Sequence, residues 1–285
     1  MGVRGLYTYC KKYLKPIKIN KNLRIGIDVS SLLYRFHGDF NETYKFLSPI
    51  IENNLIFVFD GKAPKYKEKE IGIRKETKDF ADKRITLLKE SLLQNLNDET
   101  RNLIEKRIDE LEMYNWSLTY QTLEEFKLFL KSKNLLYIKS NSEADSLLVD
   151  LYYHHVVDVI LSNDMDYLVS GIDTMYINEK GYLKEINLYE ILKFEDINLE
   201  QFRDVAVLAG IDNITYMDID DVDTAISYIR HYGSIMIMNI QYDKFFIDLN
   251  YDNIIEIKKR FYPSKNIYTH LKHEHKCILD GYLVR

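Results

Sequence analysis

The 285-residue chain is predicted to form an α/β fold with a mostly parallel central sheet flanked by helices. Short apolar runs typical of buried strands occur at Leu23–Ile27, Leu55–Phe59 and Val156–Leu161. The segments between them place apolar residues at helical spacing. An acidic side chain follows each of the three runs within a few residues. Because the carboxyl ends of parallel strands meet at one edge of a sheet, these acids are expected to converge.

The composition allows a sizeable core, since 46% of the residues are hydrophobic, enough for one large domain or two small ones. The net charge is -5, but the charge is sorted along the chain. Residues 1–27 hold seven Lys or Arg and no acid, residues 62–89 hold ten against five acids, and residues 204–223 hold six Asp and no base. This distribution indicates one surface that meets a polyanion and another that holds cations.

Two cysteines, Cys10 and Cys277, cannot build a disulfide framework, which favours a reducing compartment. The sequence has no apolar run long enough to span a membrane, and residues 1–24 lack the apolar segment of a signal peptide. We therefore expect an intracellular protein without a membrane partner.

The first part of the chain is predicted to be a helix over Leu6–Leu14 that ends at Pro16. The strand that follows delivers Asp28, and a helix begins at Ser30. The second strand delivers Asp60. Residues 66–133 then carry three helical stripes and many charges, and are expected to form an arch over the sheet edge, outside its core.

The second part resumes with a strand at Leu135–Ile138 and a helix that opens near Glu143 and Asp145. After Val156–Leu161, a hairpin is predicted over residues 174–186. Helices follow at residues 188–192 and 202–208, the latter ending at Gly210, and a further helix around residues 226–229 ends at Gly233. Residues 235–285 show no clear pattern.

Seven carboxylates stand at strand ends or helix boundaries: Asp28, Asp60, Glu143, Asp145, Asp164, Asp166 and Asp212. Gathered at one edge, they would repel one another unless divalent ions neutralised them. Ligation by oxygen alone favours Mg²⁺ or Mn²⁺ over Zn²⁺, and two ions about 4 Å apart suit the hydrolysis of a phosphodiester. Capping turns and favourable contacts with helix dipoles are the alternative roles of the closely spaced pairs.

Basic side chains that could hold a phosphate follow Asp60 in DGKAPKYKEKEIGIRK. Lys67 and Arg74 are seven residues apart, which places them on one face of a helix. The alternative is a solvated charged face. Lys62 and Lys65 lie in the same stretch and are expected to contact DNA if the acids form a nuclease site.

These motifs resemble the flap endonuclease, or XPG-type, family of structure-specific five-prime nucleases over roughly residues 1–233. MGVRGLYTYCKKYL is similar to the family's opening, IGIDVSSLLYRF and VFDGKAPKYKEKEIGIRK to its first two acidic motifs, and SEAD and SNDMD to the next two. LEQFRDVAVLAGID is similar to the stretch that ends in the last metal-binding Asp.

The resemblance implies a PIN-like nuclease domain over residues 1–233, with a helical arch at about 66–133 through which a single strand threads. All seven acids would bind metal, and Lys67 and Arg74 would match the catalytic Lys and Arg at the base of the arch. Tyr34 would stack on a nucleic-acid base near the scissile phosphate, and Gly2 would lie close to the substrate. The substrate would be DNA with a five-prime flap, a nick or an end, and the cofactor two Mg²⁺ ions, for which Mn²⁺ can substitute.

One departure concerns the helix-two-turn-helix expected at about 211–233. The family has a Gly-x-Gly hairpin there that binds duplex phosphates, whereas this chain has Asp218 and Asp220 nearest those positions. Asp lacks the backbone freedom of glycine and would repel phosphate. Duplex binding is therefore expected to be weak, displaced to the tail at 234–285, or absent. The tail has no convincing clamp-binding peptide.

Three functions remain open from the sequence. The first is an active flap endonuclease with five-prime exonuclease activity in replication, repair or recombination. The second is a five-prime exoribonuclease acting on RNA, and the third is an inactive nuclease-like scaffold that binds nucleic acid. A monomer is expected, in the nucleus or, for a viral member, in the host cytoplasm, a source that the Ile, Asn, Lys and Tyr-rich composition would suit.

The tail contains HLKHEHKC, with His270, His273, His275 and Cys277. A metal site is one interpretation, but the spacing fits no ordinary closed zinc site. A solvent-exposed tail is the preferred expectation.

Overall fold

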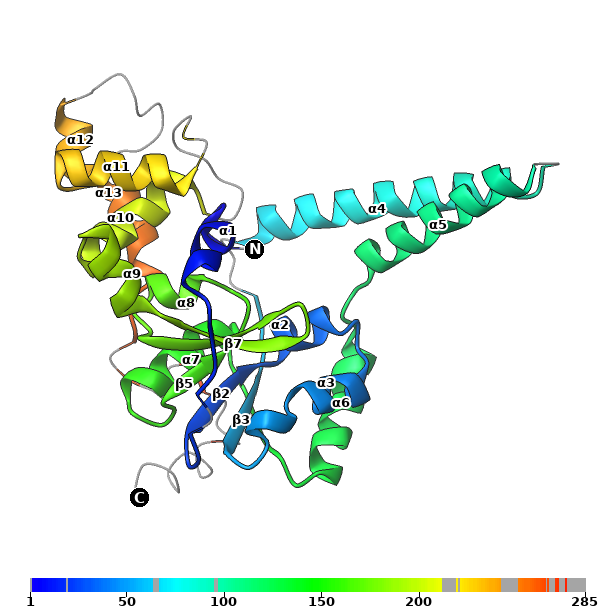
Figure 1. The fold of residues 1–285 in the computed structure, drawn as a ribbon, viewed down its shortest axis with the longest axis horizontal. Helices are drawn as coiled ribbons and strands as arrows, with labels where there is room; N and C mark the ends of the chain where they lie inside the picture. The colour runs from blue at the N-terminus through cyan, green and yellow to red at the C-terminus, as the bar shows by residue number, and fades with distance from the viewer. Residues whose placement is uncertain are drawn as a thin grey trace.

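A seven-stranded sheet, built from the described residues, lies at the centre of the computed structural model (Figure 1), in the order β1-β7-β6-β5-β2-β3-β4. The strands are β1 (Lys15–Pro16), β2 (Arg24–Asp28), β3 (Asn54–Phe59), β4 (Leu136–Lys139), β5 (Val159–Leu161), β6 (Thr174–Glu179) and β7 (Tyr182–Asn187). Strands β6, β5, β2, β3 and β4 run parallel to one another. At one end of the sheet, β7 pairs antiparallel with β6, and β1 pairs antiparallel with β7. The predicted mostly parallel sheet is confirmed.

The structure describes residues 2–18, 20–63, 67–94, 97–211, 219, 221–241, 251–264, 266, 270–271 and 275. The helices among them are α1 (Leu6–Cys10), α2 (Val29–Arg35), α3 (Phe40–Phe46), α4 (Glu68–Ser91), α5 (Asp98–Asn115), α6 (Tyr120–Ser132), α7 (Ala144–Tyr153), α8 (Asp166–Val169), α9 (Leu188–Glu195), α10 (Leu199–Ala209), α11 (Val222–Tyr232), α12 (Ile235–Gln241) and α13 (Tyr251–Lys259). Short 3-10 turns lie at Lys11–Tyr13 and Ser48–Ile50. No described helix is both long and apolar enough to cross a membrane.

Two hydrophobic layers cover the two faces of the sheet. In β3, Ile56 and Val58 belong to one layer, whereas Phe57 and Phe59 belong to the other. This division follows from the alternation of side chains along a strand. Helices α7, α8 and α10 contribute to the first layer, and α2, α3 and α6 to the second. Covered on both faces, the parallel strands hold their carboxyl ends at one edge.

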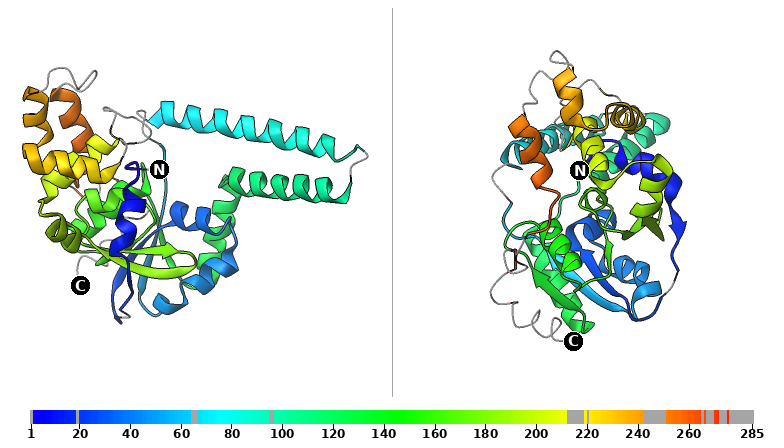
Figure 2. Two further views of the ribbon diagram at one scale, coloured as in Figure 1. Left: turned by 45° about the horizontal axis from the view of Figure 1, so that its top comes forward. Right: turned by 90° about the vertical axis from the view of Figure 1, so that its left-hand side faces the viewer.

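Helices α4 and α5 form a hairpin that projects from the body of the molecule (Figure 1, Figure 2). Ile85 of α4 and Ile108 of α5 are buried in it, and Lys89 Nζ lies 2.6 Å from Glu112 Oε1. Asn97 begins α5 by accepting a hydrogen bond from Thr100 N, as expected of an N-cap. The projecting part of the predicted arch therefore consists of two helices.

The third predicted stripe of the arch belongs to α6, which packs in the core. Phe126 and Leu130 are each 1% exposed and lie in the same hydrophobic layer as Phe57. The expectation that residues 66–133 stand outside the core is wrong for this helix. An amphipathic stripe looks the same in sequence whether it faces a partner helix or a sheet.

Two other features differ from the expectations, since an unpredicted strand contains Pro16 and strand β5 begins later than predicted. The first helix ends before Pro16, which lies in β1 and pairs with Lys184 of β7. Strand β5 begins at Val159, and Val156 and Val157 are buried in the connection before it. The residues expected to carry the glycine hairpin or its replacement, 212–218 and 220, lie outside the described part of the chain.

The tail beyond residue 233 packs on the nuclease-like body. Ile254, Ile257 and Phe261 belong to the same hydrophobic layer as α10. His270 donates or accepts a hydrogen bond at 2.7 Å from Asp150 Oδ2, and Leu271 is 1% exposed. The expectation of a solvent-exposed tail is therefore wrong at these residues, whereas His273 and Cys277 lie outside the described residues.

Candidate active site

The predicted acids follow strands that are neighbours in the sheet. Asp28 is the last residue of β2, Asp60 follows β3, and Asp164 follows β5. Parallel pairing sets β2 between β5 and β3, so the three strand ends lie side by side. Strand β4 pairs parallel with β3 and leads to the N-terminus of α7, where Glu143 is the N-cap residue. The acids of four chain segments are thus brought to one edge.

A cleft of about 560 Å³ opens at this edge. It is lined by six of the seven predicted acids, Asp28, Asp60, Glu143, Asp145, Asp164 and Asp166, and by Gly2, Tyr34, Lys67 and Arg74. Asp212 and Lys65 lie outside the described residues, although Ile211 pairs with Val3 at the edge of this cleft. Lys62 is exposed and does not line the cleft.

Asp28 is the most enclosed acid of the cleft. Its Oδ1 accepts a hydrogen bond of 3.0 Å from Ser31 N, which caps α2. Its Oδ2 accepts bonds from the Ser162 hydroxyl at 3.1 Å and the Tyr167 hydroxyl at 3.3 Å. Burial, followed by the nearby charge of Asp60, raises the pKa of Asp28 to about 7.

The other acids hold the loops of the cleft together. Asp60 accepts from Ala144 N at 2.7 Å, which joins the end of β3 to the start of α7. Asp164 Oδ1 accepts from Asp166 N at 3.1 Å and closes a turn before α8, although the N-cap residue of α8 is Met165, which makes no side-chain capping bond. Asp166 Oδ1 accepts from Val3 N at 2.9 Å, which fixes the N-terminal segment beside the acids.

Burial, together with neighbouring negative charge, raises the pKa values of several of these carboxyls. Burial comes first and is the main cause at Glu143, Asp145 and Asp164, and the charge of a neighbouring carboxylate adds to it at each. Lys67 opposes this effect at Glu143, since its Nζ lies 2.7 Å from Glu143 Oε1. The cleft is therefore a place where added positive charge is favourable.

The donor chemistry fits hard divalent cations. The acids offer carboxylate oxygens with no His or Cys lining the cleft, as Mg²⁺ and Mn²⁺ prefer. Among the described residues, no three acidic, His or Cys side chains already stand at metal-ligand spacing. Their oxygens instead bind Lys67, hydroxyls and backbone N–H groups, so cations would draw them away from these partners.

Gly2 lies against the acids more closely than any other residue type could. A Cβ atom added there would lie 2.4 Å from Asp166 Oδ1 and 2.6 Å from Asp164 Oδ1. Both distances are far inside van der Waals contact, so only glycine fits without moving the two carboxylates. The sequence motif indicated Gly2, but the reason why this position requires glycine is seen only in the folded chain.

The two predicted cations enter the cleft from the base of the hairpin. Lys67 precedes α4, Arg74 lies one to two turns into it, and both line the cleft. Tyr34 of α2 is 46% exposed and packs edge-on against Trp116, with ring centroids 5.4 Å apart. An exposed aromatic face beside the acids can stack on a nucleic-acid base.

The basic N-terminal stretch is largely matched by acids and does not form an open cationic surface. The ion pairs are Lys11 with Glu179 at 3.7 Å, Lys12 with Glu195 at 3.4 Å and Lys15 with Glu190 at 2.6 Å. Sequence reasoning also missed Ser30 and Ser162, whose hydroxyls bind Asp60 and Asp28. Their only signal is a small polar residue within two positions of a motif acid.

Comparisons with known proteins agree with this geometry. The XPG I-region family profile matches residues 134–212, the stretch from β4 to the last predicted metal-binding Asp. Flap endonuclease 1 of Enterocytozoon bieneusi is 26% identical over 272 residues, covering 82% of this chain and 71% of the relative. Flap endonuclease 1 of Zea mays is 27% identical over 282 residues, covering 86% and 71%. The chain is therefore similar to XPG-type flap endonucleases over most of its length.

Solved structures of Rad2 and of an archaeal flap endonuclease share the fold of this chain. The catalytic core of Rad2 in complex with DNA substrate superposes with a TM-score of 0.61 at 19% identity, covering 99% of this chain and 86% of that one. Flap endonuclease-1 from Methanococcus jannaschii superposes with a TM-score of 0.59 at 21% identity, covering 94% and 90%. The PIN-like architecture of the XPG-type family is therefore present here. The roles of individual site residues stay predictions.

Proposed function

We propose that this protein is a structure-specific five-prime nuclease that hydrolyses DNA phosphodiester bonds at five-prime flaps with the help of divalent cations. One observation supports it most strongly. Six carboxylates from four chain segments line one cleft together with Lys67 and Arg74. A cleft that combines many acids with two cations suits a phosphodiester, because the acids hold metal and the cations hold phosphate.

The cofactor is proposed to be two Mg²⁺ ions, for which Mn²⁺ can substitute. Asp28, Asp60, Glu143, Asp145, Asp164 and Asp166 would hold them, and Asp212, outside the described residues, would complete the set. When bound, such ions lower the pKa of a water molecule and stabilise the leaving oxygen of the phosphodiester. The structural reason for expecting them is the concentration of carboxylates in the cleft, where burial, followed by the charge of neighbouring carboxylates, raises the pKa values of Asp28, Glu143 and Asp145.

The protein's own residues would bind and orient the substrate. Lys67 now neutralises Glu143, and with metal at the acids its ammonium group would be released to a phosphate oxygen. Arg74 would hold a second oxygen of the phosphate in the bidentate manner of a guanidinium. Tyr34 would stack on the base next to the bond, and the α4–α5 hairpin would enclose the single strand.

The proposal is tested with labelled five-prime flap, nicked and single-stranded DNA incubated with the protein in Mg²⁺. We expect cleavage near the flap junction, loss of cleavage in EDTA, and recovery on addition of Mg²⁺ or Mn²⁺. The control is Asp164→Ala, which removes one carboxylate from the cleft and should abolish cleavage. If Asp164→Ala cuts as well as the parent protein, the acid cleft is not the active site.

The same assay separates the alternatives. A matched flap made of RNA that is cut in strong preference to DNA would assign an exoribonuclease. Tight binding of flap DNA without turnover in either Mg²⁺ or Mn²⁺ would assign an inactive scaffold. An unrelated ribonuclease or nuclease contaminant is excluded when the Asp164→Ala preparation shows no activity on either substrate.

A further inference from the structure

A second cleft, of about 390 Å³, lies beside the acid cleft and continues it. The two clefts share Lys67, Asp145 and Asp166 in their walls. The other side of the second cleft is formed by the described residues between 256 and 271, which we call the C-terminal segment. Lys259 and Arg260 of this segment line the cleft. A nucleic-acid strand bound at the acids would therefore run along this segment.

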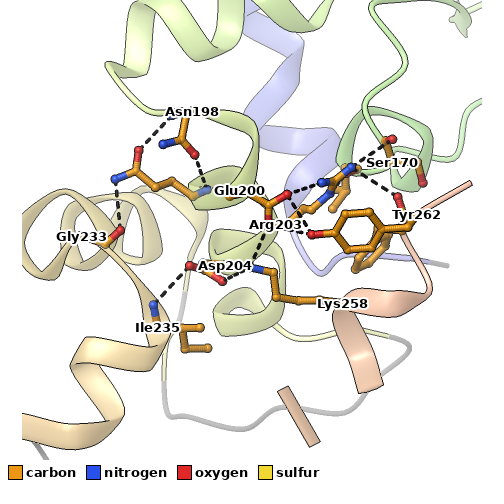
Figure 3. A network of polar contacts seen from close by, with 12 residues as sticks. Ser170, Asn198, Glu200, Arg203, Asp204, Gly233, Ile235, Lys258 and Tyr262 are labelled. Carbon is orange, nitrogen blue, oxygen red and sulfur yellow. Dashed lines mark hydrogen bonds and ion pairs between the residues drawn. The ribbon is translucent and has the colours of Figure 1, made fainter. Parts of the chain in front are cut away.

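The C-terminal segment is held by a buried arginine of α10 (Figure 3). Arg203 is 4% exposed and donates to Val169 O at 3.1 Å, to Ser170 O at 3.3 Å and to Phe261 O at 3.4 Å. Its guanidinium carbon also lies 4.1 Å from the centre of the Tyr262 ring. This one side chain ties the end of α8, which carries Asp166, to the residues that follow α13.

Glu200 and Asp204 of α10 extend the same network (Figure 3). Lys258 of α13 lies 2.8 Å from Asp204 Oδ1 and 3.2 Å from Glu200 Oε2. The Tyr262 hydroxyl donates to Glu200 at 2.8 Å. The contacts of Arg203 and Lys258 with α10 and its neighbours form the first anchor of the C-terminal segment. Lys258 is engaged in these ion pairs and only 17% of its side chain is exposed, whereas 67% of the Lys259 side chain is exposed.

A second anchor lies further along the segment. Asp150 of α7 is 1% exposed and accepts hydrogen bonds of 2.7 Å from Ser264 N and from the Ser264 hydroxyl. His270 Nδ1 lies 2.7 Å from the same carboxylate. His270 O in turn accepts from Asn141 N at 2.7 Å, in the loop just before Glu143. Two anchors therefore fix the segment on either side of the turn that follows Lys259.

We propose that the C-terminal segment is a wall of the nucleic-acid site, in which Lys259 and Arg260 bind backbone phosphates next to the one that is cut. This inference rests on the proposed function and deepens it by naming a further phosphate-binding surface. Because the neighbouring residues Lys258, Phe261 and Ser264 are held in place, the backbone that carries Lys259 and Arg260 loses little freedom when phosphate binds. This surface would bind phosphates of a duplex or a single strand, which the acidic sequence around Asp218 would repel.

The charges that face the second cleft agree with a polyanion. Lys259 has one acidic partner, Glu256 Oε2 at 3.4 Å, and both side chains are mostly exposed, so solvent screens the pair. Asp145 and Asp166 belong to the set proposed to hold cations. Asp150 is turned inward to Ser264 and His270. With metal bound, Lys67, Lys259 and Arg260 would dominate the charge along this wall.

The test measures how salt weakens DNA binding in the Asp164→Asn background, in which the DNA is not cut. Binding of labelled flap DNA is followed by fluorescence anisotropy in Mg²⁺ over about 50 to 200 mM KCl. Losing two phosphate contacts in Lys259→Ala/Arg260→Ala should make the log–log salt slope shallower by about 1.8 on duplex-containing DNA, or about 1.4 if the contacts are to a single strand. Lys259→Gln alone, at an exposed side chain, should give about half of that change.

The matched control is Lys21→Ala/Lys45→Ala, which removes the same charge from two lysines that each make one exposed ion pair away from both clefts. Its slope should equal that of the parent. Lys259→Arg/Arg260→Lys, which keeps both charges, should also bind like the parent. Equal thermal midpoints for all variants show that the anchors are intact.

A slope in Lys259→Ala/Arg260→Ala that matches the Lys21→Ala/Lys45→Ala control overturns the inference. If the unmodified protein cuts flap DNA in that case, the proposed function stands and only the C-terminal wall is wrong. If the unmodified protein neither cuts nor binds DNA, both proposals fail.

Discussion

Replacing Gly2 with alanine tests the geometry of the acid cleft most directly. The added Cβ would lie 2.4 Å from Asp166 Oδ1, whereas ordinary contacts of a Cβ atom begin at 3.4 Å. The difference, 3.4 minus 2.4, means that the carboxylate or the N-terminal segment must move by about 1 Å. Movement of the segment would also strain the bond from Val3 N to Asp166.

A displacement of about 1 Å at a reacting centre can cost about 100-fold in rate. We therefore expect Gly2→Ala to lower the single-turnover rate of flap cleavage in Mg²⁺ by about two orders of magnitude. Binding of flap DNA should change much less, because the substitution alters the acids and leaves Lys67 and Arg74 in place. The rate is measured by rapid quench with enzyme in excess over labelled flap DNA.

Gly72→Ala is the matched control. Gly72 lies within α4, and a Cβ there would meet no atom within 4 Å. This variant should keep the parent rate and gain about 0.5 to 1 kcal/mol of stability, since alanine favours a helix. A Gly2→Ala protein that cuts within threefold of the parent rate would refute the close approach of residue 2 to the acids.

Three further predictions concern charge and stacking. In EDTA, Asp28→Asn should unfold at higher temperature than the parent near pH 8, and the difference should vanish near pH 4. Burial and the charge of Asp60 raise the pKa of Asp28 in the folded protein to about 7, above its ordinary value of 3.8. The stability that protonated Asp28 contributes is therefore present at low pH and lost as the pH rises through 7, and the difference corresponds to at most about 4 kcal/mol. Arg203→Met should lower the free energy of unfolding in urea by about 1 to 3 kcal/mol, because three carbonyls lose their buried donor. Tyr34→Ala should weaken flap binding by about 1 to 3 kcal/mol if the ring stacks on a base, whereas Tyr34→Phe should bind normally.

Each of these has a contrary outcome. If the melting temperatures of the parent and of Asp28→Asn change in parallel from pH 4 to 8, then burial and neighbouring charge do not raise the pKa of Asp28. The control is Arg107→Met, which breaks an exposed ion pair with Glu110 and should change the free energy of unfolding by less than about 1 kcal/mol. If Arg203→Met loses no more stability than this control, Arg203 does not anchor the C-terminal segment. Equal binding by Tyr34→Ala and Tyr34→Phe would remove the stacking role.

The strand-end acids could be found from sequence because their signals are local. A β-branched run predicts a buried strand, and the residue that follows it must lie at the sheet edge. Asp28, Asp60 and Asp164 came together because β5, β2 and β3 are parallel neighbours, an arrangement that the pattern of strands and helices favoured. Their family-like motif order then identified the remaining acids of the cleft.

The packing partners of the helices could not be found in this way. Helix α6 carries the same kind of apolar stripe as α4 and α5, yet its Phe126 lies against the sheet. The two-residue strand β1 contains Pro16 and has no strand signal, and only its pairing with β7 defines it. Such features depend on which surfaces meet after the chain has folded back on itself.

The sequence by itself determined which residues end the strands, and hence where the carboxylates of the candidate site stand. The sequence also indicated Lys67 and Arg74, but only the tertiary structure decided which of the other cations lie near the acids. The N-terminal lysines, prominent in sequence, are matched by Glu179, Glu190 and Glu195, whereas Lys259 and Arg260 of the tail line a cleft beside the acids. The reason is physical: the direction of a strand and its next residue follow from local periodicity, but the position of a charge relative to the acids depends on contacts between segments far apart in the chain.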